Sequence, residues 1–236
     1  MRNLAVCFFA TLALAGCAVS NTPYPRPIMS PPRAAAPPGP NMYTTAPRAA
    51  LHSELFACNS WGANIGQIGQ RGEAVNYSPY IQTPAGALLR NPTEAACLSS
   101  GFGWRGSGGG GGGRTHNGLD LANPGGGFVY AAGDGWVRFT GWRGGYGNVL
   151  EIDHGQGVRT LYAHLSEIDP NLAPGSFVAA GTPVARMGAT GNATGIHLHY
   201  EVTVDGLLVD PLNYGAPPRY ETVPVTDTWP TDEPEL

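Results

Sequence analysis

Residues 197–209 read His197-Leu198-His199-Tyr200-Glu201-Val202-Thr203-Val204-Asp205-Gly206-Leu207-Leu208-Val209. The part up to Val204 is rich in β-branched and aromatic residues, which favours a strand, and Asp205-Gly206 is a strong signal for a tight turn. Alternation along a strand places His197 and His199 on one face of a sheet and Leu198 on the other. The run therefore predicts a strand that presents two imidazoles side by side.

The surrounding sequence, from about residue 98 to residue 215, repeats this pattern of short apolar runs separated by glycine. Residues 101–215 contain 28 of the 35 glycines of the chain but only five of its 22 prolines. No segment has a sustained 3.6-residue period, so helices are not expected. We predict an all-β domain of antiparallel sheets over 98–215. The runs that predict its other strands are 128–130, 135–140, 148–152 and 158–164.

The flanking regions differ in composition from this domain. Nine of the 22 prolines lie in residues 18–50, which predicts a disordered, semi-rigid tether. Residues 51–97 form an N-terminal extension to which the sequence assigns no role, and 216–236 form a solvated acidic tail. The chain of 236 residues has a net charge of −4, and all 13 basic residues are Arg, so its charge argues against nucleic-acid binding.

The first 17 residues have the features of a secretory signal. One positive charge, at Arg2, precedes an apolar run that is too short to span a bilayer. Leu14-Ala15-Gly16-Cys17 resembles the lipobox of bacterial lipoproteins, in which the cysteine becomes the lipid-bearing first residue. That resemblance implies a membrane anchor on Cys17. In Gram-negative lipoproteins, an Asp directly after the lipid-bearing cysteine resembles an inner-membrane retention signal. This chain has Ala18 at that position, so we expect the protein to be anchored in the outer membrane and to face the periplasm.

The chain has four cysteines. Cys7 leaves with the signal and Cys17 takes lipid, which leaves Cys58 and Cys97 in an oxidising compartment. We therefore expect a disulfide between them. A zinc site is disfavoured because neither cysteine belongs to a C-x-x-C pair.

Five of the six histidines lie in the predicted β-domain. His116 and Asp120 stand four residues apart across Gly118, a spacing that suits a pair of metal ligands. His197 and His199 share a strand face, as argued above. Two histidines and one carboxylate form a usual ligand set for catalytic zinc, with one position left for water.

These residues belong to an ordered set of motifs along the domain. The motifs are Ser100-Gly101-Phe102-Gly103, His116 to Asp120, Gly147-Asn148, Ile152 to Gly155, Tyr162-Ala163-His164-Leu165, Thr190-Gly191, Thr194-Gly195, His197 to Glu201 and Val209-Asp210-Pro211. This set resembles the lysostaphin/LytM-type zinc metalloendopeptidases of bacterial cell walls. The resemblance covers about half of the chain, and Ile196 departs from it because many relatives carry Pro there.

The resemblance implies that His116, Asp120 and His199 bind Zn²⁺. It also implies that His164 and His197 flank the reacting water and the scissile carbonyl, with the base being either of the two. The implied substrate is the stem peptides of peptidoglycan, cross-linked through D-Ala and diaminopimelate. The alternative is a catalytically silent LytM-type regulator that activates cell-wall amidases; such regulators have lost zinc ligands. Whether residues 51–97 or the loop Gly108–Gly113 cover the groove is open at this stage.

Overall fold

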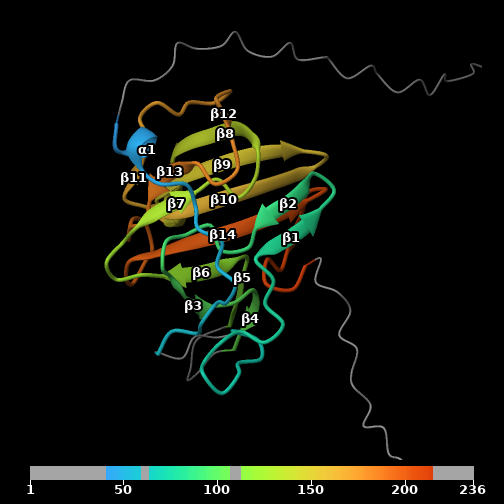
Figure 1. The fold of residues 1–236 in the computed structure, drawn as a ribbon. Helices are drawn as coiled ribbons and strands as arrows, with labels where there is room; N and C mark the ends of the chain where they lie inside the picture. Colours follow the sequence, from blue (N-terminus) through green and yellow to red (C-terminus); the bar gives the residue numbers. More distant parts are fainter. Residues whose placement is uncertain (1–40, 60–63, 107–112, 215–236) are drawn as a thin grey trace, which may run out of the picture. The chain divides into compact units, whose positions relative to one another are not determined.

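The computed structural model describes residues 41–59, 64–106 and 113–214 (Figure 1). The expected signal segment with Cys17, the tether before residue 41, the acidic tail 216–236 and most of the Gly108–Gly113 loop lie outside these residues. Those that are described belong to one compact unit, which spans 37–236. Within the described ranges, no helix is both long enough and apolar enough to cross a membrane.

The main sheet has eight strands, and every pairing in it is antiparallel. Figure 1 shows seven of them in the order β12-β8-β9-β10-β14-β6-β3, and β15 pairs with β14. The prediction of an all-β fold with antiparallel sheets is therefore confirmed. The strands are β3 (Cys97–Ser100), β6 (Leu119–Ala122), β8 (Gly135–Trp142), β9 (Asn148–Gly155), β10 (Val158–Leu165), β12 (Phe177–Val178), β14 (His197–Val204) and β15 (Leu207–Val209).

Strand β14 contributes side chains both to the main core and to the opposite face of the sheet. Its side chains alternate, so that Leu198, Tyr200 and Val202 are buried in the main core. The residues between them, His197, His199, Glu201 and Thr203, point to the opposite face. Full burial of a side chain such as that of Leu198 stabilises the fold by about 1.5 to 3 kcal/mol. The core therefore fixes the strand register, and the register fixes which face carries the imidazoles.

Smaller sheets supply further apolar residues to the core. Ile81 and Leu88 come from the hairpin of β1 (Tyr80–Thr83) and β2 (Gly86–Leu89), and both are buried in the same cluster as Leu198. Val129 and Val184 come from a second sheet. That sheet consists of β11 (Glu167–Ile168), β13 (Pro183–Arg186) and β7 (Phe128–Tyr130). A third small sheet pairs β4 (Gly103–Arg105) with β5 (Arg114–His116), and η1 (Gly144–Tyr146) is a single 3-10 turn.

Residues 41–50 differ from the extended tether that their proline content predicts. They begin with a short helix, α1 (Met42–Thr45), capped by the Asn41 side chain. Tyr43 is 3% exposed, and its ring centroid lies 5.9 Å from that of Phe128. Asn41 Nδ2 donates to Asp169 Oδ1 at 2.9 Å, and Arg48 donates to the Ala180 carbonyl at 2.8 Å. One buried aromatic side chain and these polar contacts attach the segment to the β-domain, so the expectation of a tether is wrong for residues 41–50.

A buried arginine links the N-terminal extension to the end of the β-domain. Arg90 follows β2 and is only 1% exposed. Its burial lowers the pKa of its guanidinium. Four backbone carbonyls compensate by accepting hydrogen bonds from this side chain, those of Ser78, Tyr80, Pro211 and Leu212. Residues 51–97 thus pack into the same unit as the sheet, through an anchor that local sequence patterns do not predict.

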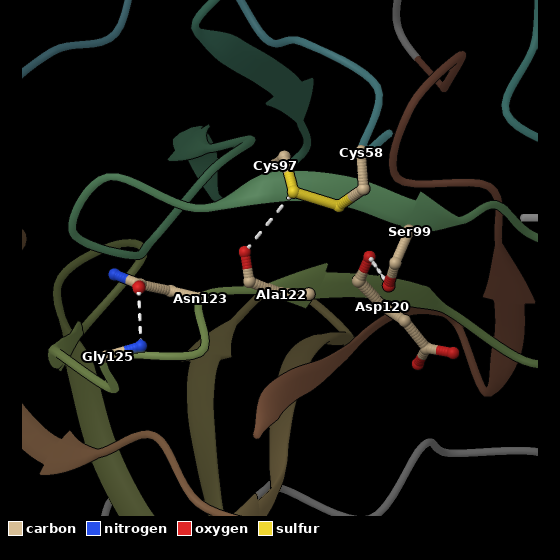
Figure 2. Close-up of a disulfide and its surroundings, with 7 residues drawn as sticks. All are labelled: Cys58, Cys97, Ser99, Asp120, Ala122, Asn123 and Gly125. Carbon is tan, nitrogen blue, oxygen red and sulfur yellow. Dashed lines mark hydrogen bonds between the residues drawn. A yellow bond between two sulfur atoms is a disulfide. The ribbon is translucent and has the colours of Figure 1, made fainter. Parts of the chain in front are cut away.

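A disulfide joins Cys58 to Cys97, 39 residues further along the chain (Figure 2). Cys97 opens β3, the edge strand that pairs with β6. Beside the disulfide, Ser99 Oγ donates to the backbone carbonyl of Asp120 at 3.0 Å. The cross-link therefore fixes residue 58 to β3, the strand that pairs with the strand carrying Asp120.

Candidate metal centre and groove

Neighbouring strands bring the three candidate metal ligands together. Asp120 on β6 and His199 on β14 are directly paired in the sheet. His116 ends β5, and Gly118 allows the chain to turn from it into β6. A Cβ at Gly118 would lie 2.2 Å from the Tyr200 carbonyl oxygen, which no larger residue tolerates without displacing β14. The glycine of the His116–Asp120 motif is thus required by this close approach.

The ligand atoms of these residues form a compact triangle. His116 Nε2 lies 3.0 Å from Asp120 Oδ1 and 3.0 Å from His199 Nδ1, and His199 Nδ1 lies 2.9 Å from Asp120 Oδ1. His116 and His199 are 7% and 6% exposed, so little water competes for them. Within the described ranges, this is the group of His, Cys, Asp and Glu side chains that could hold a metal ion.

Second hydrogen bonds leave a lone pair on each of the three atoms. His116 Nδ1 lies 2.7 Å from the Gly101 carbonyl, which can only accept, so its Nε2 is unprotonated in the neutral ring. His199 Nε2 donates to Glu201 Oε1 at 3.0 Å, which leaves Nδ1 free. Asp120 Oδ2 accepts from Arg105 Nη2 at 2.7 Å, which leaves Oδ1 free.

Three lone pairs this close repel one another unless a cation lies among them. Zinc binds N and O donors at about 2.0 to 2.2 Å in a tetrahedron, which spaces the donors about 3.3 Å apart. The separations of 2.9 to 3.0 Å are close to that spacing. Outer hydrogen bonds to a carbonyl and a carboxylate are also what orients histidine ligands in metal sites. The residues therefore fit a divalent ion of the zinc type.

The pKa shifts of His199 and Asp120 also indicate that the site favours positive charge. Burial lowers the pKa of His199, but its hydrogen bonds to Asp120 and Glu201 outweigh burial and raise it to about 9. Burial raises the pKa of Asp120, but hydrogen bonds from His116 and His199 outweigh it and hold that pKa well below its usual range. A proton is favoured at this point in the metal-free protein, so metal binding must displace it.

His164 and His197 lie beside this triangle, with their ring centroids 4.7 Å apart. Nδ1 of His164 donates to the Thr190 carbonyl at 2.8 Å, and Nδ1 of His197 donates to the Gly195 carbonyl at 2.8 Å. Both rings therefore keep an unprotonated Nε2 when neutral. Burial lowers the pKa of His164, and nearby His197 adds to the effect. His164 also has a φ of 58°, a strained conformation of the kind that clusters at functional sites.

All five histidine and aspartate candidates line one groove of about 330 Å³. That volume suits part of an extended peptide. No described residue of 51–97 lines the groove. The remaining two histidines lie elsewhere: His52 bonds to the Thr93 carbonyl, and His154 contacts the Asp134 carbonyl and Thr160 Oγ1.

Three site residues have roles that the sequence did not assign. Glu201 orients His199 and also accepts from Tyr146 Oη at 2.8 Å, and Arg105 holds Asp120. Alternation along β14 offered a signal for Glu201, because it shares the face of His197 and His199. Arg105 and Tyr146 come from distant strands and turns, so no local pattern pointed to them.

An antiparallel sheet with two histidines and an aspartate around one point, and two more histidines facing the same groove, has the arrangement of a mononuclear metallopeptidase site. Residues 114–211, somewhat less than half of the chain, match peptidase family M23. The matched range begins at Arg114 and includes all five histidine and aspartate candidates.

Named relatives and a solved structure agree with this assignment. The chain is 45% identical over 104 residues to the DD-carboxypeptidase/endopeptidase Mpg of Neisseria meningitidis, and 41% identical over 102 residues to the peptidoglycan DD-endopeptidase ShyB of Vibrio cholerae. These alignments cover 44% and 43% of this chain but 24% of each relative. A zinc-containing peptidase from Vibrio cholerae is similar in structure, with 33% identity and a TM-score of 0.52. That match covers 58% of this chain and 47% of the other.

Proposed function

We propose that this chain is a zinc-dependent endopeptidase that hydrolyses the peptide cross-links of peptidoglycan. The observation that carries the proposal is the triangle of ligand atoms on His116, Asp120 and His199, 2.9 to 3.0 Å apart in a groove that also holds His164 and His197. Similarity to Mpg and ShyB, both named endopeptidases, supports the reaction, and the name of ShyB, a peptidoglycan DD-endopeptidase, supports the substrate.

In this proposal His116, Asp120 and His199 hold the metal ion. Zinc bound there would supply Lewis-acid chemistry, lowering the pKa of water to about 7 and polarising a carbonyl group. Glu201 keeps the proton of His199 on Nε2, so that Nδ1 faces the ion. Arg105 occupies Asp120 Oδ2 and so presents Oδ1 to it.

His164 and His197 perform the proton transfers. Each ring is fixed by its Nδ1–H, and each presents Nε2 to the groove. One of them accepts the proton of the attacking water at Nε2 and returns it to the leaving amine. The other donates a hydrogen bond to the developing oxyanion, which requires it to be protonated at Nε2 at that moment. The two rings have the same hydrogen-bonding pattern, so either can be the base.

The proposed location is the cell envelope, with a lipid on Cys17 anchoring the chain in the outer membrane and the enzyme facing the periplasm. Residues 1–17 would be the signal, and the Pro-rich segment that follows would be the tether. The support is the lipobox-like Leu14-Ala15-Gly16-Cys17 together with the disulfide of Cys58 and Cys97, which suits an oxidising compartment. The catalytic domain would cover 98–215, with 51–97 as an extension that packs on it.

The activity is tested by incubating the purified chain with zinc and peptidoglycan sacculi, then separating the released muropeptides. We expect cross-linked dimers to disappear, and this loss to be absent in His199→Ala and in the presence of a chelator. His52→Ala is the matched control, because His52 lies outside the groove. Equal muropeptide patterns with and without His199 would contradict the proposal. They would favour a regulator of cell-wall amidases, a reading that the intact ligand set disfavours.

A further inference from the structure

Two arginines stand directly opposite each other on the hairpin that leads into the metal site. Arg105 on β4 and Arg114 on β5 are register partners, so their side chains project from the same face of this small sheet. Both line the groove, next to His116 and Asp120. In the proposed mechanism, the role of Arg105 is to hydrogen-bond to Asp120 Oδ2, and Arg114 has no role.

The donors of Arg105 are only partly used. Its Nη2 donates to Asp120 at 2.7 Å, and this ion pair fixes the guanidinium at the groove, with the side chain 20% exposed. Its Nε is buried without a hydrogen-bond acceptor among the described residues. A guanidinium has five N–H donors in a fixed fork, so one carboxylate oxygen leaves most of them available.

Arg114 is exposed, and in the described part of the chain it has no hydrogen bond or ion pair. The formally charged side chains among the described lining residues are Arg105, Arg114 and Asp120, so the groove carries +1 with its histidines neutral. The whole chain carries −4. The net charge of the groove is therefore opposite in sign to that of the whole chain, and a bound divalent ion would add to the positive charge of the groove.

We propose that Arg105 and Arg114 form a carboxylate-binding subsite for the substrate, adjacent to the metal ligands. This inference rests on the proposed function and names the feature of the peptide that the groove recognises. In a D-Ala–diaminopimelate cross-link, the carbon that bears the scissile amide nitrogen also bears a free carboxylate. A carboxylate so close to the reacting bond must lie near the metal ligands, where the two arginines are.

Arginine suits this role because its planar fork matches a carboxylate with two parallel hydrogen bonds. Asp120 keeps Arg105 in place, and Arg114 supplies the charge that Asp120 does not neutralise. The subsite therefore selects peptides in which that carboxylate is free over peptides in which it is amidated.

The test measures binding of two hydrolysis-resistant D-Ala–diaminopimelate probes to the zinc-loaded full chain by calorimetry. In both probes a ketomethylene group replaces the scissile amide, and the adjacent carboxylate is either free or a carboxamide. We expect the wild type to bind the free acid at least about tenfold more tightly, as for a charge-assisted hydrogen bond. Arg114→Gln should remove most of this preference, and Arg114→Lys should retain part of it. Arg138→Gln is the matched control: Arg138 is an exposed arginine on β8, outside the groove.

Zinc content is measured in every variant, and Arg114→Gln should retain the wild-type value because Arg114 does not contact a metal ligand. The proposal is overturned if the wild type binds both probes equally or binds neither, or if Arg114→Gln keeps the full preference. Because the probes are not cleaved, this result is independent of peptidoglycan hydrolysis. A failure of the proposed function would appear instead as unchanged sacculi alongside an intact preference for the acid.

Discussion

Glu201 provides a sharp test of how the metal centre is built. Glu201 is 6% exposed, and its carboxylate accepts hydrogen bonds from His199 Nε2 at 3.0 Å and from Tyr146 Oη at 2.8 Å. Glu201→Gln keeps the size of the side chain but removes the charge that fixes the His199 proton on Nε2. Outer partners of histidine ligands contribute about 10- to 100-fold to metal affinity, so we expect the zinc Kd to rise by that factor. This equals about 1.4 to 2.7 kcal/mol.

The assay is competition for zinc between the protein and a chromophoric chelator at fixed pH. Glu151→Gln is the matched control, because Glu151 lies on β9, which β10 separates from β14, and pairs with Arg138 and Arg143 instead of a metal ligand. Tyr146→Phe removes one hydrogen bond from Glu201 and should weaken zinc binding less than Glu201→Gln does. A Kd for Glu201→Gln within twofold of the wild type, or an equal loss in Glu151→Gln, would refute the role given to this carboxylate.

Three further predictions concern the fold and the lipid on Cys17. Arg90→Ala removes the donors that four backbone carbonyls accept from, one of them buried, and should destabilise the protein by about 3 kcal/mol or more, measured by urea unfolding. A change below about 1 kcal/mol would contradict the stabilising role of Arg90. Replacing Cys58 and Cys97 by Ser opens a loop of 39 residues and should lower the free energy of unfolding by about 4 kcal/mol; wild-type protein under reductant should match the variant, and equal stability of oxidised and reduced protein would argue against the cross-link. Cys17→Ser should abolish palmitate labelling in cells, and unchanged labelling would exclude a lipid on Cys17.

Sequence patterns predicted those strands in which apolar and polar residues alternate clearly and a glycine-containing turn follows. The run from His197 to Val204 forms one strand as expected, and the Asp205-Gly206 turn connects it to β15. The predicted run 128–130 coincides with β7. Alternation also placed His197 and His199 on one face, because the strand has period 2 and its apolar residues must face the core.

The N-terminal extension could not be predicted in the same way, because long-range contacts stabilise it. The β1–β2 hairpin buries Ile81 and Leu88 in a core cluster that also contains Leu198, more than a hundred positions away. Arg90 depends on the carbonyls of Pro211 and Leu212. Tyr43 lies in a proline-rich stretch, and tertiary contacts such as that with Phe128 reveal that the segment is folded. The outer partners Arg105 and Tyr146 were missed for the same reason, since sheet topology brings them to the site.

The central claim is that one metal ion held by His116, Asp120 and His199 drives cleavage of peptidoglycan cross-links. The most direct measurement titrates the metal-free protein with zinc while following the loss of cross-linked muropeptide dimers. We predict that activity rises in proportion to added zinc, reaches its plateau at one equivalent per chain, and is absent from His199→Ala at every zinc level. Cleavage that proceeds without metal, or that persists in His199→Ala, would contradict the account.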